Sequence, residues 1–244
     1  MNRTPGIFLW LALAFAIGEP VAGEEGWGSL QGQVVVIGNV PQLGPAAPAN
    51  GLCPSVDVPN ESLVVDAESG GLRNVAVYLR KAPARIHPEL QTPTERPAQM
   101  LLQNCRFIPR MQIVRTGQTI ELTNEDPLDH SPRWYPFANS LPAYSIPAKP
   151  QTFEFAKAER IPLKLTCDLH PYMTAWWILL DHPYAAITDA QGRFRLENLP
   201  SGQHELVLWH ERKGYLNKNL RVQVEPGDNA LPSVRIPVAE LLEQ

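Results

Sequence analysis

One short segment, "CDLHPYM" at 167–173, brings together a thiol, an imidazole and a thioether from Cys167, His170 and Met173. The cuprous ion favours soft sulfur ligands, whereas the cupric ion accepts imidazole nitrogen. Two histidines, one cysteine thiolate and a weak axial methionine form a trigonal site that suits copper in both oxidation states. The segment therefore supplies three of these four donors, and Pro171 restricts the backbone between them.

The fourth donor has to come from elsewhere in the chain. His130 lies in "ELTNEDPLDHSPRW" (121–134), in a loop that follows a strand-like segment. His130 is therefore the candidate for the fourth donor. A catalytic zinc is a weaker interpretation, because it needs an open position and usually a general base beside it. The simplest alternative is that Cys167 is an inert buried thiol.

The elements that must position these residues look like β-strands. Short runs with alternating apolar and polar residues recur, as in "MQIVRTGQTIELTN" (111–124), and are bounded by Pro, Gly, Asn and Asp. Long helical periodicities are scarce, so the sequence predicts an all-β protein built from β-sandwiches. We expect 83–104, which prolines interrupt, to be a surface connection. We expect 125–150, with its six prolines, to be loop.

Aromatic residues accompany both parts of the expected site. In a strand after the metal loop, one of Trp176 and Trp177 should face the core and the other the surface or a neighbouring sandwich. A second apolar group lies next to His130 and either covers the copper or forms a docking patch for a redox partner. Its members are Pro132, Trp134, Tyr135 and Phe137.

Residues 107–180 resemble the cupredoxins, the small blue-copper electron carriers. The stretch "FIPRMQIVRTGQTIELTNEDPLDH" (107–130) looks like their strand pair followed by a ligand histidine, and Asn124 matches the residue that ends the strand before the ligand loop. The Cys-x-x-His-Pro-x-Met loop has the short spacing seen in amicyanin. The resemblance implies a cupredoxin-like Greek-key domain with one type 1 copper per chain, bound by His130, Cys167, His170 and Met173.

The same resemblance implies one-electron transfer between redox partners, such as a cytochrome c or a dehydrogenase, with the edge of His170 as the exit. The chain departs from the amicyanin-like pattern after the first ligand. It has Ser131, Pro132 and Arg133 where that pattern has Asn and soon a second His. Because hydrogen bonds near the metal help to set its potential, the reduction potential is not carried over.

Two further segments resemble the carboxypeptidase regulatory-like (transthyretin-like) β-sandwich. They are "GQVVVIG…LRNVAVYL" and "TDAQGRFRLENLPSGQHELVL". We expect one such sandwich from residues 29–83 plus 184–238, with the cupredoxin-like domain, 84–183, inserted. Three independent modules are less attractive, because the first segment alone is too short to bury a core. The whole arrangement resembles a group of exported bacterial proteins sometimes labelled methylamine utilisation proteins.

The N-terminus has the layout of a secretory signal peptide. Arg3 precedes an apolar run at 7–18 and small residues at 21–23, so we expect 1–23 to be removed and the protein to be periplasmic or secreted. A retained anchor is the alternative. No later segment is apolar enough for a transmembrane helix. The net charge of −4, without a basic stripe, argues against nucleic acid as a partner.

The number of cysteines is uneven, so at least one of them cannot form a disulfide within an exported chain. The chain has three cysteines. Cys53 and Cys105 lie in irregular, polar segments, where a disulfide between loops would stabilise the fold. We expect a disulfide between Cys53 and Cys105 and a reduced Cys167.

Two classes of function fit these features. The first is an exported electron carrier that is not an enzyme. The second is a non-redox binding or scaffold module, or a copper storage or delivery protein, with a degenerate cupredoxin site. No His-x-His pair occurs, which argues against an oxidase with further copper ions. A hydrolase has no nucleophile–base motif to support it.

Overall fold

The computed structural model describes residues 26–49, 57–140 and 150–243, and their regular secondary structure is almost wholly β-strand. The expected signal peptide, 1–23, and Cys53 lie outside the described residues. The prediction of an all-β protein is confirmed: the α-helical content of the described part is one short helix, α1 (Val238–Leu242). No helix among the described residues is long and apolar enough to cross a membrane.

The strands of the described part form four sheets, which we call sheets I to IV. In sheet I, the long strand β1 (Trp27–Ile37) pairs with β12 (Arg193–Pro200), β15 (Gly227–Ala230) and β16 (Val234–Pro237). Sheet II has the strand order β11 (Ala185–Ile187), β2 (Ala76–Leu79), β13 (Gly202–His210), β14 (Gly214–Val224). Sheet III has the order β5 (Met111–Arg115), β10 (Thr174–Leu180), β9 (Leu163–Cys167), β7 (Pro132–Trp134). Sheet IV has the order β4 (Arg106–Ile108), β3 (Ala98–Gln103), β6 (Thr119–Asn124), β8 (Gln151–Glu154).

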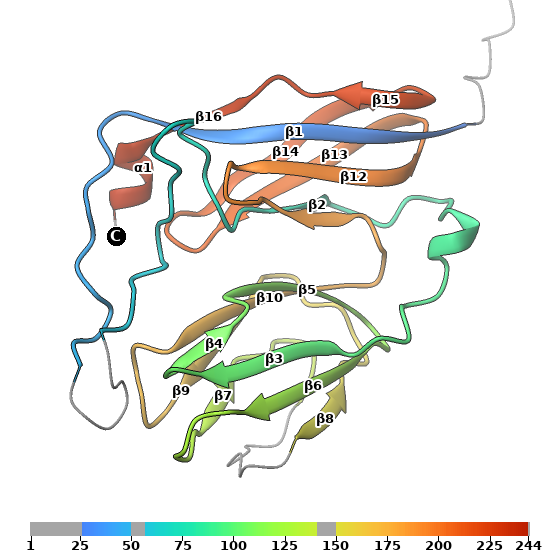
Figure 1. The fold of residues 1–244 in the computed structure, drawn as a ribbon. Coiled ribbons are helices and arrows are strands. Elements are labelled where there is room, and N and C mark those ends of the chain that lie inside the picture. The colour runs from blue at the N-terminus through green and yellow to red at the C-terminus, as the bar shows by residue number, and fades with distance from the viewer. Residues whose placement is uncertain (1–25, 50–56, 141–149, 244) are drawn as a thin grey trace, which may run out of the picture.

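The four sheets are stacked in layers, with sheets I and II in the upper half of Figure 1 and sheets III and IV in the lower half. A hydrophobic cluster fills each of the three spaces between neighbouring sheets. Sheets I and II take their strands from residues 27–79 and 185–237, and sheets III and IV take theirs from 98–180. The burial of apolar side chains between layers therefore holds the described part of the chain together.

The two middle sheets are covered on both faces, which explains their continuously apolar strands. All four residues of β2 are buried: Val77 and Leu79 pack toward sheet I, and Tyr78 packs toward sheet III. Strand β10 behaves in the same way. The prediction for its tryptophans is confirmed, because Trp177 lies in the cluster between sheets III and IV and Trp176 packs against the cluster shared with sheet II.

The expectation that 83–104 is only a surface connection is wrong at its C-terminal end. Strand β3 begins directly after Pro97, and its alternate residues Ala98, Met100 and Leu102 are buried. β3 then pairs with β4 and β6 in the centre of sheet IV. The prolines end just before the strand, so every residue of β3 keeps the backbone N–H that sheet pairing requires.

The expectation that 125–150 is only loop is wrong for β7, the short strand that follows His130. Pro132 pairs with Cys167 and Trp134 pairs with Leu165 of β9. β7 forms the edge of sheet III, and an edge strand tolerates proline because one side of its backbone has no sheet partner. This pairing sets the distance between the two parts of the expected metal site.

Candidate metal centre

Three of the four predicted ligands meet at the end of sheet III. Cys167 is the last residue of β9, and its partner on β7, Pro132, comes two residues after His130. The N–H of Asp168 also donates to the carbonyl of Ser131 at 2.9 Å. The backbone pairing therefore brings His130 beside Cys167, although 37 positions separate them in sequence. His170 follows on the loop after β9.

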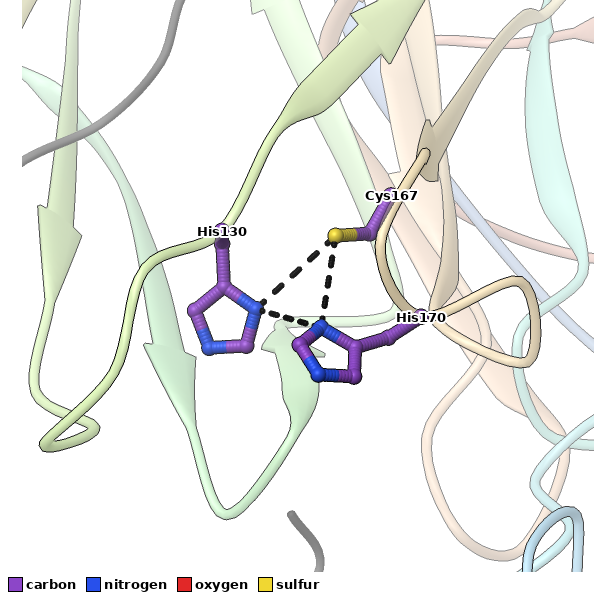
Figure 2. A group of neighbouring side chains, drawn as sticks. All are labelled: His130, Cys167 and His170. Atoms are coloured by element: carbon purple, nitrogen blue, oxygen red, sulfur yellow. Dashed lines mark hydrogen bonds between the residues drawn. The ribbon is translucent and has the colours of Figure 1, made fainter. Parts of the chain in front are cut away.

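The donor atoms of these residues form a compact triangle, drawn in Figure 2. Cys167 Sγ lies 3.8 Å from His130 Nδ1 and 3.6 Å from His170 Nδ1, and the two nitrogens are 3.2 Å apart. The same group of residues meets the geometric conditions for binding a metal ion. One donor atom of each of the three side chains points toward the other two.

The size of the triangle fits a metal ion. A point equidistant from the three atoms lies about 2 Å from each, which is a normal metal–nitrogen distance and slightly short for metal–sulfur. Two imidazoles and one thiolate are a donor set that copper uses in trigonal electron-transfer sites. The residues present therefore fit a copper ion.

The triangle is shielded from solvent on most sides. His130 is 0% exposed and Cys167 is 1% exposed, whereas His170 is only partly buried. Among the described residues, the Nε2 atom of His170 has no hydrogen-bond partner. The imidazole of His170 therefore connects the buried triangle to the surface of the protein.

Met173, the fourth predicted ligand, lies on the same loop and is 2% exposed. Its N–H donates to the carbonyl of His170 at 2.9 Å, which closes a tight turn between the two residues. Met173 also belongs to the same hydrophobic cluster as Cys167. The loop thus carries the methionine into the core beside the cysteine, and its role as an axial ligand stays a prediction.

The surroundings of Cys167 favour the thiolate that a metal needs. Burial by itself disfavours the charged form, but hydrogen bonds from His130 and from the backbone N–H groups of Ser131, Leu169 and His170 lower the pKa of Cys167 below its ordinary value. The Ser131 N–H lies 3.4 Å from the sulfur. Those same groups can hold the sulfur in place when a metal binds.

The two imidazoles differ in their electrostatic surroundings. Burial and the neighbouring His130 lower the pKa of His170. Burial also disfavours the charged form of His130, but its hydrogen bonds to Cys167 and Asp126 raise the pKa overall. The neutral His170 can therefore offer its Nδ1 lone pair to a metal over a wide pH range.

Asp126 is a functional residue that the sequence reasoning missed. Its Oδ2 lies 2.9 Å from His130 Nε2, and its side chain is 7% exposed. Since a carboxylate only accepts, His130 must donate from Nε2, which leaves the Nδ1 lone pair for a metal. The spacing of four residues between Asp126 and His130 was visible in the sequence, but loop residues at that spacing carry no general signal of contact.

The loop from Asn124 to His130 is held by its own hydrogen bonds. Asn124 accepts from the N–H of Asp126 at 3.0 Å and donates to the carbonyl of Leu128 at 2.7 Å. Asn124 is the last residue of β6, where the cupredoxin resemblance expects it. The chain itself therefore shapes this loop, and His130 enters the triangle in a fixed orientation.

The apolar group next to His130 divides into two parts. Trp134 is 7% exposed and belongs to the cluster between sheets III and IV, whereas Tyr135 and Phe137 are 54% and 75% exposed. Strand alternation in β7 buries Pro132 and Trp134 and leaves Arg133 outside. Neither of the two interpretations, a copper cover or a docking patch, therefore applies to the whole group.

The cysteine expectations have separate outcomes. Cys167 is a free cysteine and is buried, as expected. The expected disulfide partner of Cys105 is Cys53, which lies outside the described residues, so that bond stays a prediction.

No protein-family profile matches the sequence, and no curated protein matches it. Solved structures do match. A reduced amicyanin mutant has 14% identity and a TM-score of 0.31 over 36% of this chain and 86% of amicyanin. A purple cupredoxin from Nitrosopumilus maritimus has 16% identity and a TM-score of 0.28 over 34% of this chain and 99% of its own.

A copper-containing nitrite reductase from Thermus scotoductus also matches, with 18% identity and a TM-score of 0.29. That match covers 34% of this chain and only 22% of the reductase. Since all three TM-scores are near 0.3, we base the functional assignment on the side chains of this protein.

Proposed function

We propose that this protein binds one copper ion through His130, Cys167, His170 and Met173 and transfers single electrons between redox proteins. The observation that supports the proposal is the buried triangle of Cys167 Sγ and the two Nδ1 atoms. A structural zinc site would be a closed tetrahedron of thiolate and imidazole ligands, and only three such donors meet at this point among the described residues.

When bound, copper supplies one-electron chemistry, because it is stable in the cuprous and cupric states. The chain itself holds the three donors at metal-binding distances, so little has to move when the oxidation state changes. Burial of His130 and Cys167 limits the access of water to the metal. His170 is partly exposed, which makes its ring edge the exit toward a partner such as a cytochrome c or a dehydrogenase. On this proposal the protein is a carrier and not an enzyme.

We also propose that residues 84–183 are a cupredoxin-like domain inserted into a regulatory-like sandwich of residues 29–83 plus 184–238. The separate origin of the strands supports this division, since no sheet of the described part mixes strands from the two sets. Export by a signal peptide at 1–23 to the periplasm or beyond belongs to the same proposal, and its support is the sequence pattern alone.

The test is anaerobic titration of the full chain with cupric ion, followed by visible and electron paramagnetic resonance spectra. We expect one equivalent to bind and to produce the intense blue band and narrow hyperfine splitting of a copper–thiolate site. Cys167→Ser should abolish the band completely, because a hydroxyl cannot replace the thiolate at neutral pH. His204→Ala, a histidine on β13 in sheet II, serves as the matched control and should leave the spectrum unchanged.

A wild-type chain that stays colourless with cupric ion would contradict the electron-carrier proposal. Tighter binding of zinc than of copper in a parallel titration with zinc would favour a structural or storage role for the triangle instead. Binding of copper without reversible one-electron reduction would favour storage or delivery.

A further inference from the structure

The two pairs of sheets meet at a buried ion pair close to the metal loop. Arg110, just before β5, donates from Nε and one Nη to the two oxygens of Glu211 at 2.6 and 2.7 Å. Glu211 lies in the turn between β13 and β14 of sheet II. Their side chains are 15% and 7% exposed. A forked pair of this kind fixes the relative orientation of both groups, because it has two parallel hydrogen bonds.

The ion pair connects directly to the end of the metal loop. The other Nη of Arg110 donates to the carbonyl of Thr174 at 3.4 Å, and Thr174 follows Met173. The Arg110 carbonyl accepts from the N–H of Trp176 at 2.8 Å. Arg110 and Met173 also line the same small cavity. Arg110 thus holds the backbone at the start of β10, directly after the loop that carries Met173.

Glu211 makes a second contact with the same strand. Its Oε2 accepts from Trp176 Nε1 at 3.3 Å, and the Trp176 ring packs on Trp209 of β13 with the ring centroids 4.8 Å apart. Glu211 therefore holds β10 through a charged group and through an aromatic side chain. Both contacts cross from sheet II to sheet III, so neither exists in the part of the chain that carries the metal ligands alone.

We propose that Glu211 is a positioning residue for the metal centre: through Arg110 and Trp176 it fixes the end of the loop that carries Met173. This inference rests on the proposed copper function. It gives sheets I and II a role in the metal centre, because they hold Glu211 in place. Without the carboxylate, Arg110 has no anionic partner, and the carbonyl of Thr174 loses a fixed donor. The loop can then relax and let the cupric ion adopt the tetragonal arrangement it prefers.

The test compares Glu211→Gln with the wild-type full chain. We expect the ratio of cuprous to cupric affinity to fall about tenfold, which is a drop of about 59 mV in the one-electron potential. The electron paramagnetic resonance spectrum should shift toward a tetragonal site. In the copper-free chain, the backbone amides of Met173 and Trp176 should exchange with solvent at least about tenfold faster, because opening of the loop becomes easier.

The matched control is Glu205→Gln. Glu205 lies on β13 as well, but it is 40% exposed and pairs with the exposed Arg80 and Arg221. It should change neither the potential nor the amide exchange of the loop. Arg110→Lys is the second test variant, since lysine keeps the charge but lacks the fork that reaches both Glu211 and Thr174. It should reproduce the effect of Glu211→Gln, and it keeps the proposal testable if that variant fails to fold.

The outcomes separate this inference from the copper proposal. Unchanged potential, spectrum and amide exchange in a folded, blue Glu211→Gln chain would overturn the positioning role alone. Faster amide exchange in Glu211→Gln, combined with a wild-type chain that binds no copper, would support the structural link and contradict the copper function. A shift of equal size in Glu205→Gln would also overturn the inference, because it would show a general effect of surface charge.

Discussion

At the scale of single residues, the pair of His130 and Asp126 does most to define the centre. Asp126 also accepts from the backbone N–H groups of Asn104 and Cys105 at 2.6 and 2.9 Å. Both of those residues have positive φ angles, 51° and 57°, in the turn between β3 and β4. The carboxylate is therefore fixed by the backbone of one sheet while it orients a ligand at the edge of another.

Asp126→Asn tests this arrangement. The negative charge of Asp126 makes the His130 imidazole a stronger ligand and so favours the cupric ion. Loss of that charge should weaken cupric binding about tenfold. The corresponding rise in the copper potential is about 60 mV, which protein-film voltammetry can measure. Asp129→Asn is the control, because Asp129 lies in the same loop but its carboxylate is exposed and makes no hydrogen bond to His130, Cys167 or His170. Equal shifts in both variants would argue against a specific role of the hydrogen bond to His130.

At the scale of elements, the turn before β12 connects three segments at close range. Gly192 has a φ of 73°, and a Cβ there would lie 2.2 Å from the carbonyl oxygen of Val34 and 2.7 Å from the nitrogen of Leu72. The Gly192 carbonyl accepts from the N–H of Val34 at 2.8 Å. Only glycine combines this backbone conformation with such a close approach.

Gly192→Ala should therefore lower the free energy of unfolding by about 3 kcal/mol, from backbone strain and overpacking together. Gly117→Ala is the matched control. Gly117 has a φ of 76°, but a Cβ there would meet nothing within 4 Å. It should cost only about 1 kcal/mol. Urea unfolding of the two copper-free variants measures the difference, and equal losses would refute the steric explanation.

The same scale shows how far sequence patterns reach. The alternation in 111–124 predicted β5 and β6, and the strand expected after the metal loop is β10. β3 was missed because the preceding prolines dominate the pattern of 83–104. β7 was missed because a proline inside a three-residue edge strand leaves no local signal that distinguishes it from loop.

At the scale of the whole molecule, sheet II carries a buried titratable side chain next to the turn that holds Glu211. His210, at the end of β13, is 1% exposed, and burial followed by the charges of Arg110 and Arg212 lowers its pKa to about 4. Its Nδ1 accepts from the N–H of Arg212 at 3.3 Å. The neutral imidazole is thus the form that the folded chain accommodates.

This predicts a loss of stability in acid. The pKa of His210 is lower in the folded chain than its ordinary value of 6.5, so the unfolded chain binds the proton first as the pH falls. The stabilisation is complete above pH 6.5 and is lost as the pH falls toward 4, by about 3 kcal/mol in total.

The measurement is urea unfolding of the copper-free chain at several pH values within that window. His210→Asn, whose amide oxygen can replace Nδ1 as acceptor, should make the pH dependence shallower. The control, His204→Asn, lies on the same strand and should keep the wild-type slope. A steep loss that persists in His210→Asn would assign the effect to other groups.

The sequence by itself determined which residue types could bind copper and that the chain would be all-β. It could do so because ligand chemistry depends on donor atoms and strand formation depends on local alternation. Only the tertiary structure decided that three of the predicted ligands converge, that Asp126 orients His130, and that Glu211 reaches Arg110 beside the metal loop. The contacts of His130 with Cys167 and of Glu211 with Arg110 join residues on separate strands or loops, and their positions follow from how whole sheet faces pack to bury apolar surface.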